Sequence, residues 1–203
     1  GDAVDLPGNS TSTVTNGGAA NLVQDGSFEL GSPNGTWAEA STNFGTPLCT
    51  VGLCGTGTGT GPRTGDWWAW FGGIAAFEEG SVSQSLVIPA GATTLDFWFE
   101  AIVCASPADF LEVLVDGNQV WVIDGSSPLC GVLGYSAQSA DISAYADGAS
   151  HTIEFHSIST GAGNTNFFVD DVELFSPPTC PGDTLAGSVL EIPTLHPVGL
   201  GLL

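Results

Sequence analysis

Thr94-Leu-Asp-Phe-Trp-Phe-Glu-Ala-Ile-Val103 is the stretch of sequence that decides the fold class. Large apolar side chains alternate in it with acidic or amphipathic ones: Leu95, Phe97 and Phe99 alternate with Asp96, Trp98 and Glu100. Because successive side chains of a β-strand point to opposite faces, this period of two indicates a strand with one face in a core. Ile153 and Phe155 alternate with polar residues in the same way.

Similar short runs rich in Val, Ile, Phe and Trp recur from residue 21 onward, and Asp-Gly turn signals follow several of them. The predicted strands are residues 21–30, 67–72, 81–88, 94–103, 109–116, 118–123, 150–158 and 166–175, with a further strand near 132–137. No stretch shows a helical period. Eight or so strands at short spacing predict an all-β fold, an antiparallel β-sandwich of the jelly-roll type with extended N- and C-terminal arms.

The chain divides into three parts by composition. Residues 1–20 form a Gly/Ser/Thr-rich N-terminal arm, residues 21–175 form the jelly-roll sandwich, and residues 176–203 form a Pro/Gly linker and a C-terminal tail. Residues 31–66 are too long and too Gly/Thr-rich for an ordinary connection between strands. This segment is either a functional loop or a mobile surface loop held by Cys49 and Cys54.

Charge excludes two classes of partner. The chain has one Lys or Arg, Arg63, against 22 acidic residues, and its formal net charge is −21. Nucleic acid is therefore excluded, because phosphate binding needs a basic surface, and an anionic membrane surface would repel the protein. Hydrophobic residues make up 42% of the sequence, which is enough to build a core in spite of the acidity. No segment is long and apolar enough to span a membrane.

The five cysteines lack the spacings of zinc or redox sites. We therefore predict two disulfides, Cys49 with Cys54 and Cys104 with Cys130, which leave Cys180 either free or bonded to another chain. Disulfides indicate an oxidising compartment. We expect a bacterial protein that is extracellular or on the cell surface after removal of a signal peptide.

Enzyme signatures are missing from the sequence. It contains no Gly-x-Ser-x-Gly elbow, no His-Glu-x-x-His and no phosphate-binding loop. His151 and His156 fall on opposite faces of one predicted strand, and both are interpreted as surface or packing residues. Among 22 acidic residues, chance carboxylate pairs are expected. The prediction is that the protein is not an enzyme.

Two segments resemble a known family. Asn21-Leu-Val-Gln-Asp-Gly-Ser-Phe-Glu29, followed by Trp37, and Phe168-Val-Asp-Asp-Val-Glu-Leu174 resemble calcium-binding jelly-roll modules related to carbohydrate-binding modules. The segment from Thr46 to Gly73 looks like a variant found in exported proteobacterial proteins. Ile192-Pro-Thr-Leu195 resembles an IPTL-type C-terminal sorting signal, although His196-Pro-Val198 departs from it.

Calcium is the predicted cofactor. Strict alternation would put Asp170 on the same face as Phe168, Val172 and Leu174, and a buried carboxylate without a partner is costly. Since Lys and Arg are almost absent, a hard cation with oxygen ligands would stabilise it. Glu29 and Asp25 in the first predicted strand could join it, because first and last strands are commonly neighbours. The family resemblance also implies calcium there.

Three tryptophans are candidates for contact with a sugar or a partner: Trp37, Trp68 and Trp98. Trp68 belongs to an aromatic run that alternates across a strand, and Trp98 shares its predicted face with two carboxylates. Exposed tryptophan beside carboxylates is typical of a sugar-binding face. Core packing or a contact with a partner subunit explains these residues equally well.

Two functions follow from these observations. The first is a non-enzymatic extracellular structural protein, a calcium-stabilised subunit of a self-assembling surface filament or matrix. Its copies would join when the tail around Val189 to Leu195, or the arm around Thr13 to Val23, pairs with a sheet edge of a neighbour. The alternative is a carbohydrate-binding module or adhesin, with a polysaccharide as partner.

Overall fold

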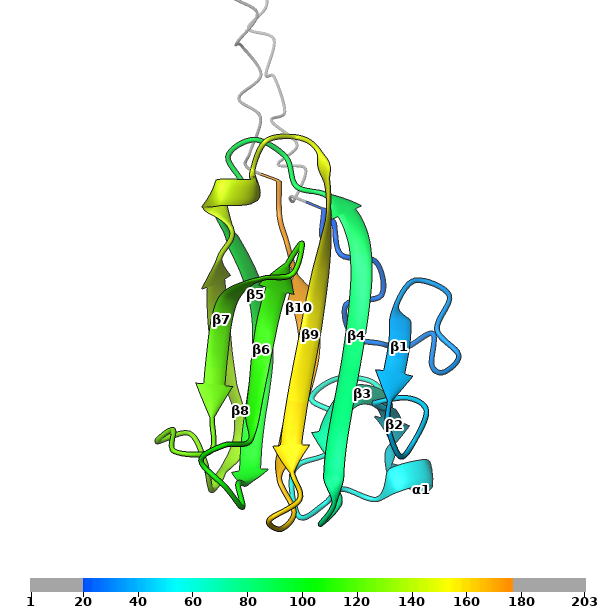
Figure 1. The fold of residues 1–203 in the computed structure, drawn as a ribbon. Coiled ribbons are helices and arrows are strands. Elements are labelled where there is room, and N and C mark those ends of the chain that lie inside the picture. The colour runs from blue at the N-terminus through cyan, green and yellow to red at the C-terminus, as the bar shows by residue number, and fades with distance from the viewer. Residues whose placement is uncertain (1–19, 177–203) are drawn as a thin grey trace, which may run out of the picture.

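The structure is a computed structural model that describes residues 20–176, and these residues form a sandwich of two antiparallel sheets (Figure 1). The first sheet has the strand order β1-β4-β9-β6-β7 and the second has the order β2-β3-β10-β5-β8. The elements are β1 (Ala38–Ser41), β2 (Leu48–Thr50), α1 (Val51–Cys54), β3 (Trp67–Gly72), β4 (Phe77–Val87), β5 (Thr94–Val103), β6 (Phe110–Val115), β7 (Asn118–Asp124), β8 (Val132–Asp141), a 3-10 turn (Ser143–Tyr145), β9 (Ser150–Thr160) and β10 (Asn166–Glu173). The predicted antiparallel sandwich is confirmed.

The main core lies between the two sheets and follows the alternation seen in the sequence. Leu95, Phe97 and Phe99 on β5 are buried, and Phe97 meets Phe155 of β9 edge to face, with ring centroids 5.1 Å apart. Trp121 of β7 contacts Phe97 from the other side at 5.1 Å. Each such side chain stabilises the fold by about 1.5–3 kcal/mol through burial. The aromatic rows therefore join the two sheets.

The last strand, β10, changes face at Asp171. Phe168 and Asp170 point away from the main core, whereas Val172 and Leu174 belong to it. The pairing of β10 with β5 shifts register after Asp170, and Asp171 has a φ of 47°. This left-handed conformation, which aspartate tolerates, marks a β-bulge. The predicted alternation is wrong beyond Asp170, because the bulge inserts one residue and reverses the faces that follow.

The predicted strand over residues 21–30 is also wrong, because the chain makes turns there. The segment nevertheless lies against the end of β10, as predicted for the first and last segments. The side chain of Asn21 donates to the carbonyl of Val172 at 3.0 Å and accepts the N–H of Leu174 at 2.9 Å. Gly26 fits close to β10 because it has no side chain, since a Cβ there would lie 2.1 Å from the Val172 oxygen.

Residues 31–66 hold elements that the sequence pattern did not reveal. The short strands β1 and β2 each lie at the edge of a sheet, and the single turn α1 follows β2. Three or four residues are too few to show a period of two. Residues 55–65 of this segment fold back over the second sheet, as described below.

Both predicted disulfides are present, Cys49 with Cys54 and Cys104 with Cys130. Cys180 and most of the two predicted arms lie outside the described residues, so the strand exchange predicted for them stays a prediction. Between residues 20 and 176, no helix is long and apolar enough to cross a membrane.

Candidate functional site

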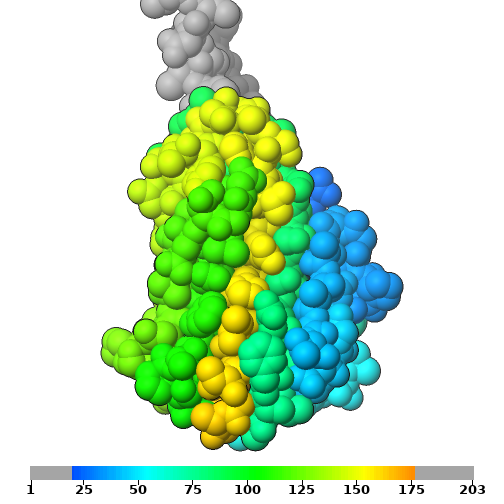
Figure 2. All heavy atoms as spheres, viewed as in Figure 1, coloured from blue at the N-terminus to red at the C-terminus, as the bar shows by residue number. Residues whose placement is uncertain are grey.

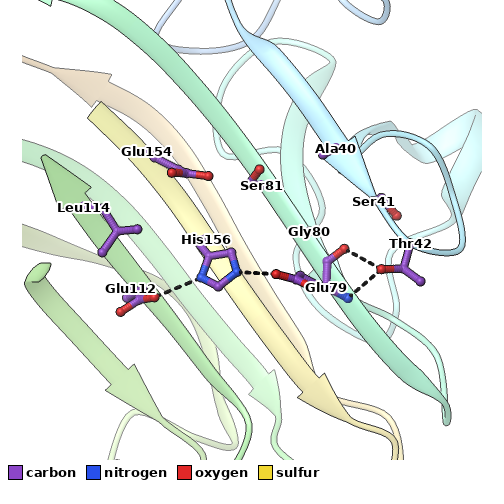
Figure 3. A pocket seen from close by; sticks show the side chains of 10 residues that line it. All are labelled: Ala40, Ser41, Thr42, Glu79, Gly80, Ser81, Glu112, Leu114, Glu154 and His156. Carbon is purple, nitrogen blue, oxygen red and sulfur yellow. Dashed lines mark hydrogen bonds and ion pairs between the residues drawn. The ribbon is translucent and has the colours of Figure 1, made fainter. Parts of the chain in front are cut away.

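An open groove with a volume of about 520 Å³ crosses the outer face of the first sheet. No segment of the described chain lies across this face in Figure 2. The groove is lined from β1, β4, β6, β9 and the turn after β1, by Ala40, Ser41, Thr42, Glu79, Gly80, Ser81, Glu112, Leu114, Glu154 and His156 (Figure 3).

Strand register explains why this face is hollow. Ser81 of β4 lies opposite Ala40 of β1 on one side and opposite His156 of β9 on the other. His156 in turn lies opposite Glu112 of β6. One row of side chains thus runs across four strands. It has the small Ala40 and Ser81 at one end and the large polar His156 and Glu112 at the other. The small pair forms the floor of the groove, and polar groups from β6 and β9 stand beside it.

His156 connects three strands of the groove. Its Nδ1 lies 2.9 Å from a carboxylate oxygen of Glu112, and its Nε2 lies 3.1 Å from one of Glu79 (Figure 3). Burial opposes a charged imidazole, but the hydrogen bonds that the ring donates to Glu112 and Glu79 outweigh it and raise the pKa of His156 above its ordinary value. The sequence had suggested only a surface or packing role for this residue.

The groove is acidic. Glu79, Glu112 and Glu154 all line it, and His156 is the one lining residue that can carry a positive charge. Carboxylate oxygens accept hydrogen bonds, so the groove suits a ligand rich in hydroxyl donors. An anionic ligand would meet repulsion from the groove and from a chain of net charge −21.

Part of the outer face of the second sheet is covered by the chain itself. Residues 55–65 lie over it, and two of their glycines, Gly57 and Gly59, lie against aromatic rings. A Cβ on Gly57 would lie 2.4 Å from the Trp70 ring, and one on Gly59 would lie 2.4 Å from the Phe168 ring. Close packing on this face therefore explains the glycines at positions 57 and 59, and we call residues 55–65 the cover.

Glu100 fastens the middle of this cover. Its side chain is on the outer face of β5 and is almost completely buried. The carboxylate accepts hydrogen bonds from the Thr60 hydroxyl at 2.6 Å, the Thr60 N–H at 3.2 Å and the Gly134 N–H at 3.1 Å. The Tyr135 hydroxyl adds a hydrogen bond to the carbonyl of Gly61 at 2.7 Å.

Asp170 fastens the cover near its C-terminal end and is fully buried. It accepts the N–H groups of Arg63 at 2.7 Å, Thr64 at 3.2 Å and Asp171 at 2.8 Å. Burial and the negative charge of Asp171 raise the pKa of Asp170 to about 7, although the N–H groups act in the opposite direction. The Arg63 guanidinium pairs with Asp171 and lies 3.6 Å from the centroid of the Trp98 ring.

Two of the three predicted contact tryptophans are core residues. Trp37 packs on Phe28 and donates its indole N–H to the carbonyl of Asp25 at 2.9 Å. Trp68 is fully buried beside Phe168. Predicting sugar or partner contact for Trp37 and Trp68 is therefore wrong, because Trp37 packs against the turn that holds Asp25 and Phe28, and Trp68 packs against Trp70 and Phe168. Trp98 is half-buried beneath Arg63.

The predicted calcium ligands have other hydrogen-bond partners. Asp25 accepts N–H bonds within its own turn, and Glu29 accepts the N–H groups of Asp66 and Trp67. Asp170 is held as described above. Across the described part of the chain, no group of three or more Asp, Glu, His or Cys side chains is arranged to hold a metal ion. The three carboxylates thus have hydrogen-bond partners within the chain itself, and calcium stays a prediction from the sequence.

The groove could not be located from sequence. Alternation along residues 81–88 and 150–158 shows that Ser81 and His156 face away from the core, but it does not show which strands are neighbours. Strands β4, β6 and β9 are far apart in the chain and meet only through the sheet order.

Comparison with known proteins identifies the fold. The sequence matches no protein-family model and no curated protein. TmCBM61 in complex with β-1,4-galactotriose is 18% identical, with a TM-score of 0.54 over 78% of this chain and all of that chain. Family 16 Carbohydrate Binding Module-2 is 16% identical (TM-score 0.47, 77% of this chain, 100% of that chain). The K1 cleaved adhesin domain of Lys-gingipain from Porphyromonas gingivalis W83 is 13% identical (TM-score 0.48, 75% of this chain, 96% of that chain). The predicted jelly-roll sandwich is confirmed.

A substitution of Glu100 tests whether it fastens residues 55–65. In Glu100→Gln, an amide NH₂ replaces an oxygen that faces N–H donors, so the cover should lose about 1.5–3 kcal/mol of stabilisation. Arg63 is the one trypsin cleavage site in the sequence. Trypsin should therefore cut the variant at Arg63 roughly tenfold or more faster, which mass spectrometry can follow. Glu112→Gln, on the other sheet, is the control. Equal cleavage rates in wild type and Glu100→Gln would show that Glu100 does not hold the cover.

Proposed function

We propose that this domain is a non-catalytic, extracellular carbohydrate-binding module whose groove on the first sheet holds a polysaccharide without acidic groups. The observation that carries the proposal is the open groove itself. It is long enough to cross four strands, it has a floor of small residues, and it presents carboxylate, hydroxyl and imidazole groups. Sugar hydroxyl groups are natural partners for such side chains.

The charge of the domain supports the choice of ligand class. Glu79, Glu112 and Glu154 accept hydrogen bonds from hydroxyl groups but repel carboxylate or sulfate groups on a glycan. The ring of Phe110, which is on the same side of β6 as Glu112, stands 6.0 Å from that of His156 and offers an apolar contact to a sugar ring that extends beyond the groove.

The fold is consistent with a binding module. TmCBM61, which has the same fold, has been solved with β-1,4-galactotriose bound. The two disulfides are compatible with an extracellular protein. The filament hypothesis depends on terminal segments outside residues 20–176. Nothing among the described residues favours it over carbohydrate binding, so the binding module becomes the main proposal.

Filling the groove should abolish binding. Ser81→Phe places a large ring on the groove floor at a partly exposed β position, where phenylalanine suits a strand. We expect affinity for the best ligand in a panel of neutral polysaccharides to fall by about tenfold or more, measured by affinity electrophoresis and isothermal titration.

Ser85→Phe is the matched control, because Ser85 lies on the same face of β4 but does not line the groove. It should bind like the wild type. If Ser81→Phe keeps full affinity, or Ser85→Phe weakens binding equally, the groove is not the binding site.

Calcium is proposed as a stabilising ligand on the sequence evidence alone. A ligand that binds only the folded state raises its stability, so excess chelator should lower the melting temperature of protein purified with bound metal. Asp170→Asn should reduce calcium affinity more than Asp171→Asn, because the Asp171 carboxylate faces the side chains of Arg63 and Thr64. An unchanged melting temperature in chelator would contradict the proposal.

A further inference from the structure

The contacts of His156 require a particular protonation state. A neutral imidazole has one N–H donor and one acceptor nitrogen, whereas the imidazolium has two donors. Both ring nitrogens of His156 face carboxylate oxygens, Glu112 at 2.9 Å and Glu79 at 3.1 Å. Carboxylates accept hydrogen bonds but do not donate them when ionised. The arrangement is therefore complete only when His156 carries a positive charge.

The two carboxylates are held unequally. Glu112 is fastened from β7 as well, because the side chain of Gln119 donates to its other oxygen at 2.6 Å. The Glu79 carboxylate has no such second contact among the described residues, and the side chain is 52% exposed. If His156 becomes neutral, the tautomer that keeps its bond to Glu112 turns a lone pair toward Glu79. Glu79 is then repelled and free to turn into the groove.

We propose that His156 is a positioning residue that makes the groove pH-sensitive: the imidazolium ties Glu79 down, and the neutral imidazole frees Glu79 to accept hydroxyl groups of a bound glycan. The effect on glycans rests on the proposed function. Binding should then strengthen as pH rises. Three elements supply the titratable groups around His156, namely Glu79 on β4, Glu112 on β6 and Glu154 on its own strand β9. The β1 side of the groove supplies uncharged residues.

The direction of the pH effect on stability follows from linkage. The pKa of His156 is raised in the folded protein by Glu112 and Glu79 against the opposing effect of burial. Its contribution to stability is then fully present below the ordinary histidine pKa of about 6.5 and is lost as pH rises through the folded value. Acid should therefore stabilise this part of the sheet while it restrains Glu79.

The chain contains a matched control histidine. His151, near the start of β9, also lies between two carboxylates, with Nδ1 2.7 Å from Asp116 and Nε2 3.0 Å from Asp147. Hydrogen bonds to Asp116 and Asp147 likewise raise the pKa of His151. It does not line the groove. His151→Gln therefore removes the same chemistry from a place where it should not affect glycan binding.

The test combines nuclear magnetic resonance with binding measurements on the full chain. Titration should show the Glu79 carboxyl carbon changing shift together with the His156 ring in the wild type, and this linked change should disappear in His156→Gln. Affinity for the best neutral polysaccharide should rise several-fold from about pH 5.5 to about pH 8.5 in the wild type and His151→Gln, and should be flat in His156→Gln.

The outcomes separate the two proposals. If Glu79 follows His156 but no polysaccharide binds at any pH, the proposed function fails and the pH-dependent positioning of Glu79 stands. If the Glu79 resonance does not follow His156, or if a bound polysaccharide shows the same pH profile in His156→Gln as in the wild type, the role assigned to His156 is wrong.

Discussion

The scarcity of positive charge decides how this fold holds its buried polar groups. Among the described residues, four acidic side chains are buried: Glu78, Glu100, Asp109 and Asp170. None of them forms an ion pair with Arg63 or with a histidine in that part of the chain. A buried carboxylate without compensation is very costly, and charge-assisted hydrogen bonds are the alternative to an ion pair. Backbone N–H groups and hydroxyl groups supply these bonds here.

The groups that donate hydrogen bonds to these carboxylates come mostly from loops and strand ends. Each buried carboxylate therefore fastens a loop or a strand end to the sandwich. Glu78 accepts the N–H of Asn43 in the turn after β1. Burial opposes the charge of Asp109, but the N–H of Thr160 and the hydroxyl of Thr165 outweigh it and lower the pKa of Asp109. Glu100 and Asp170 fasten the cover on the second sheet. Part of the outer face of that sheet is therefore covered, and the groove lies on the first sheet.

The sequence predicted the regular parts of this structure better than the parts that build the site. Alternation over 94–103 located β5 and its buried face, because a period of two reports directly on which side is in the core. The same rule failed after Asp170, where a bulge that depends on a left-handed aspartate reverses the faces. Trp68 was a candidate for sugar contact because nothing in the local sequence shows that Trp70 and Phe168 pack against its ring. His156 needed the register of three distant strands before its neighbours could be named.

Amide hydrogen exchange tests most directly whether loop N–H groups compensate the buried carboxylates. Asn43, Thr60, Arg63 and Thr64 lie outside the strands, yet their N–H groups point at Glu78, Glu100 or Asp170. With hydrogen bonds to buried charges worth about 1.5–3 kcal/mol, these amides should exchange roughly tenfold to a hundredfold more slowly than in the unfolded chain. Exchange at the unfolded rate at these four positions would contradict this account of how the fold is held together.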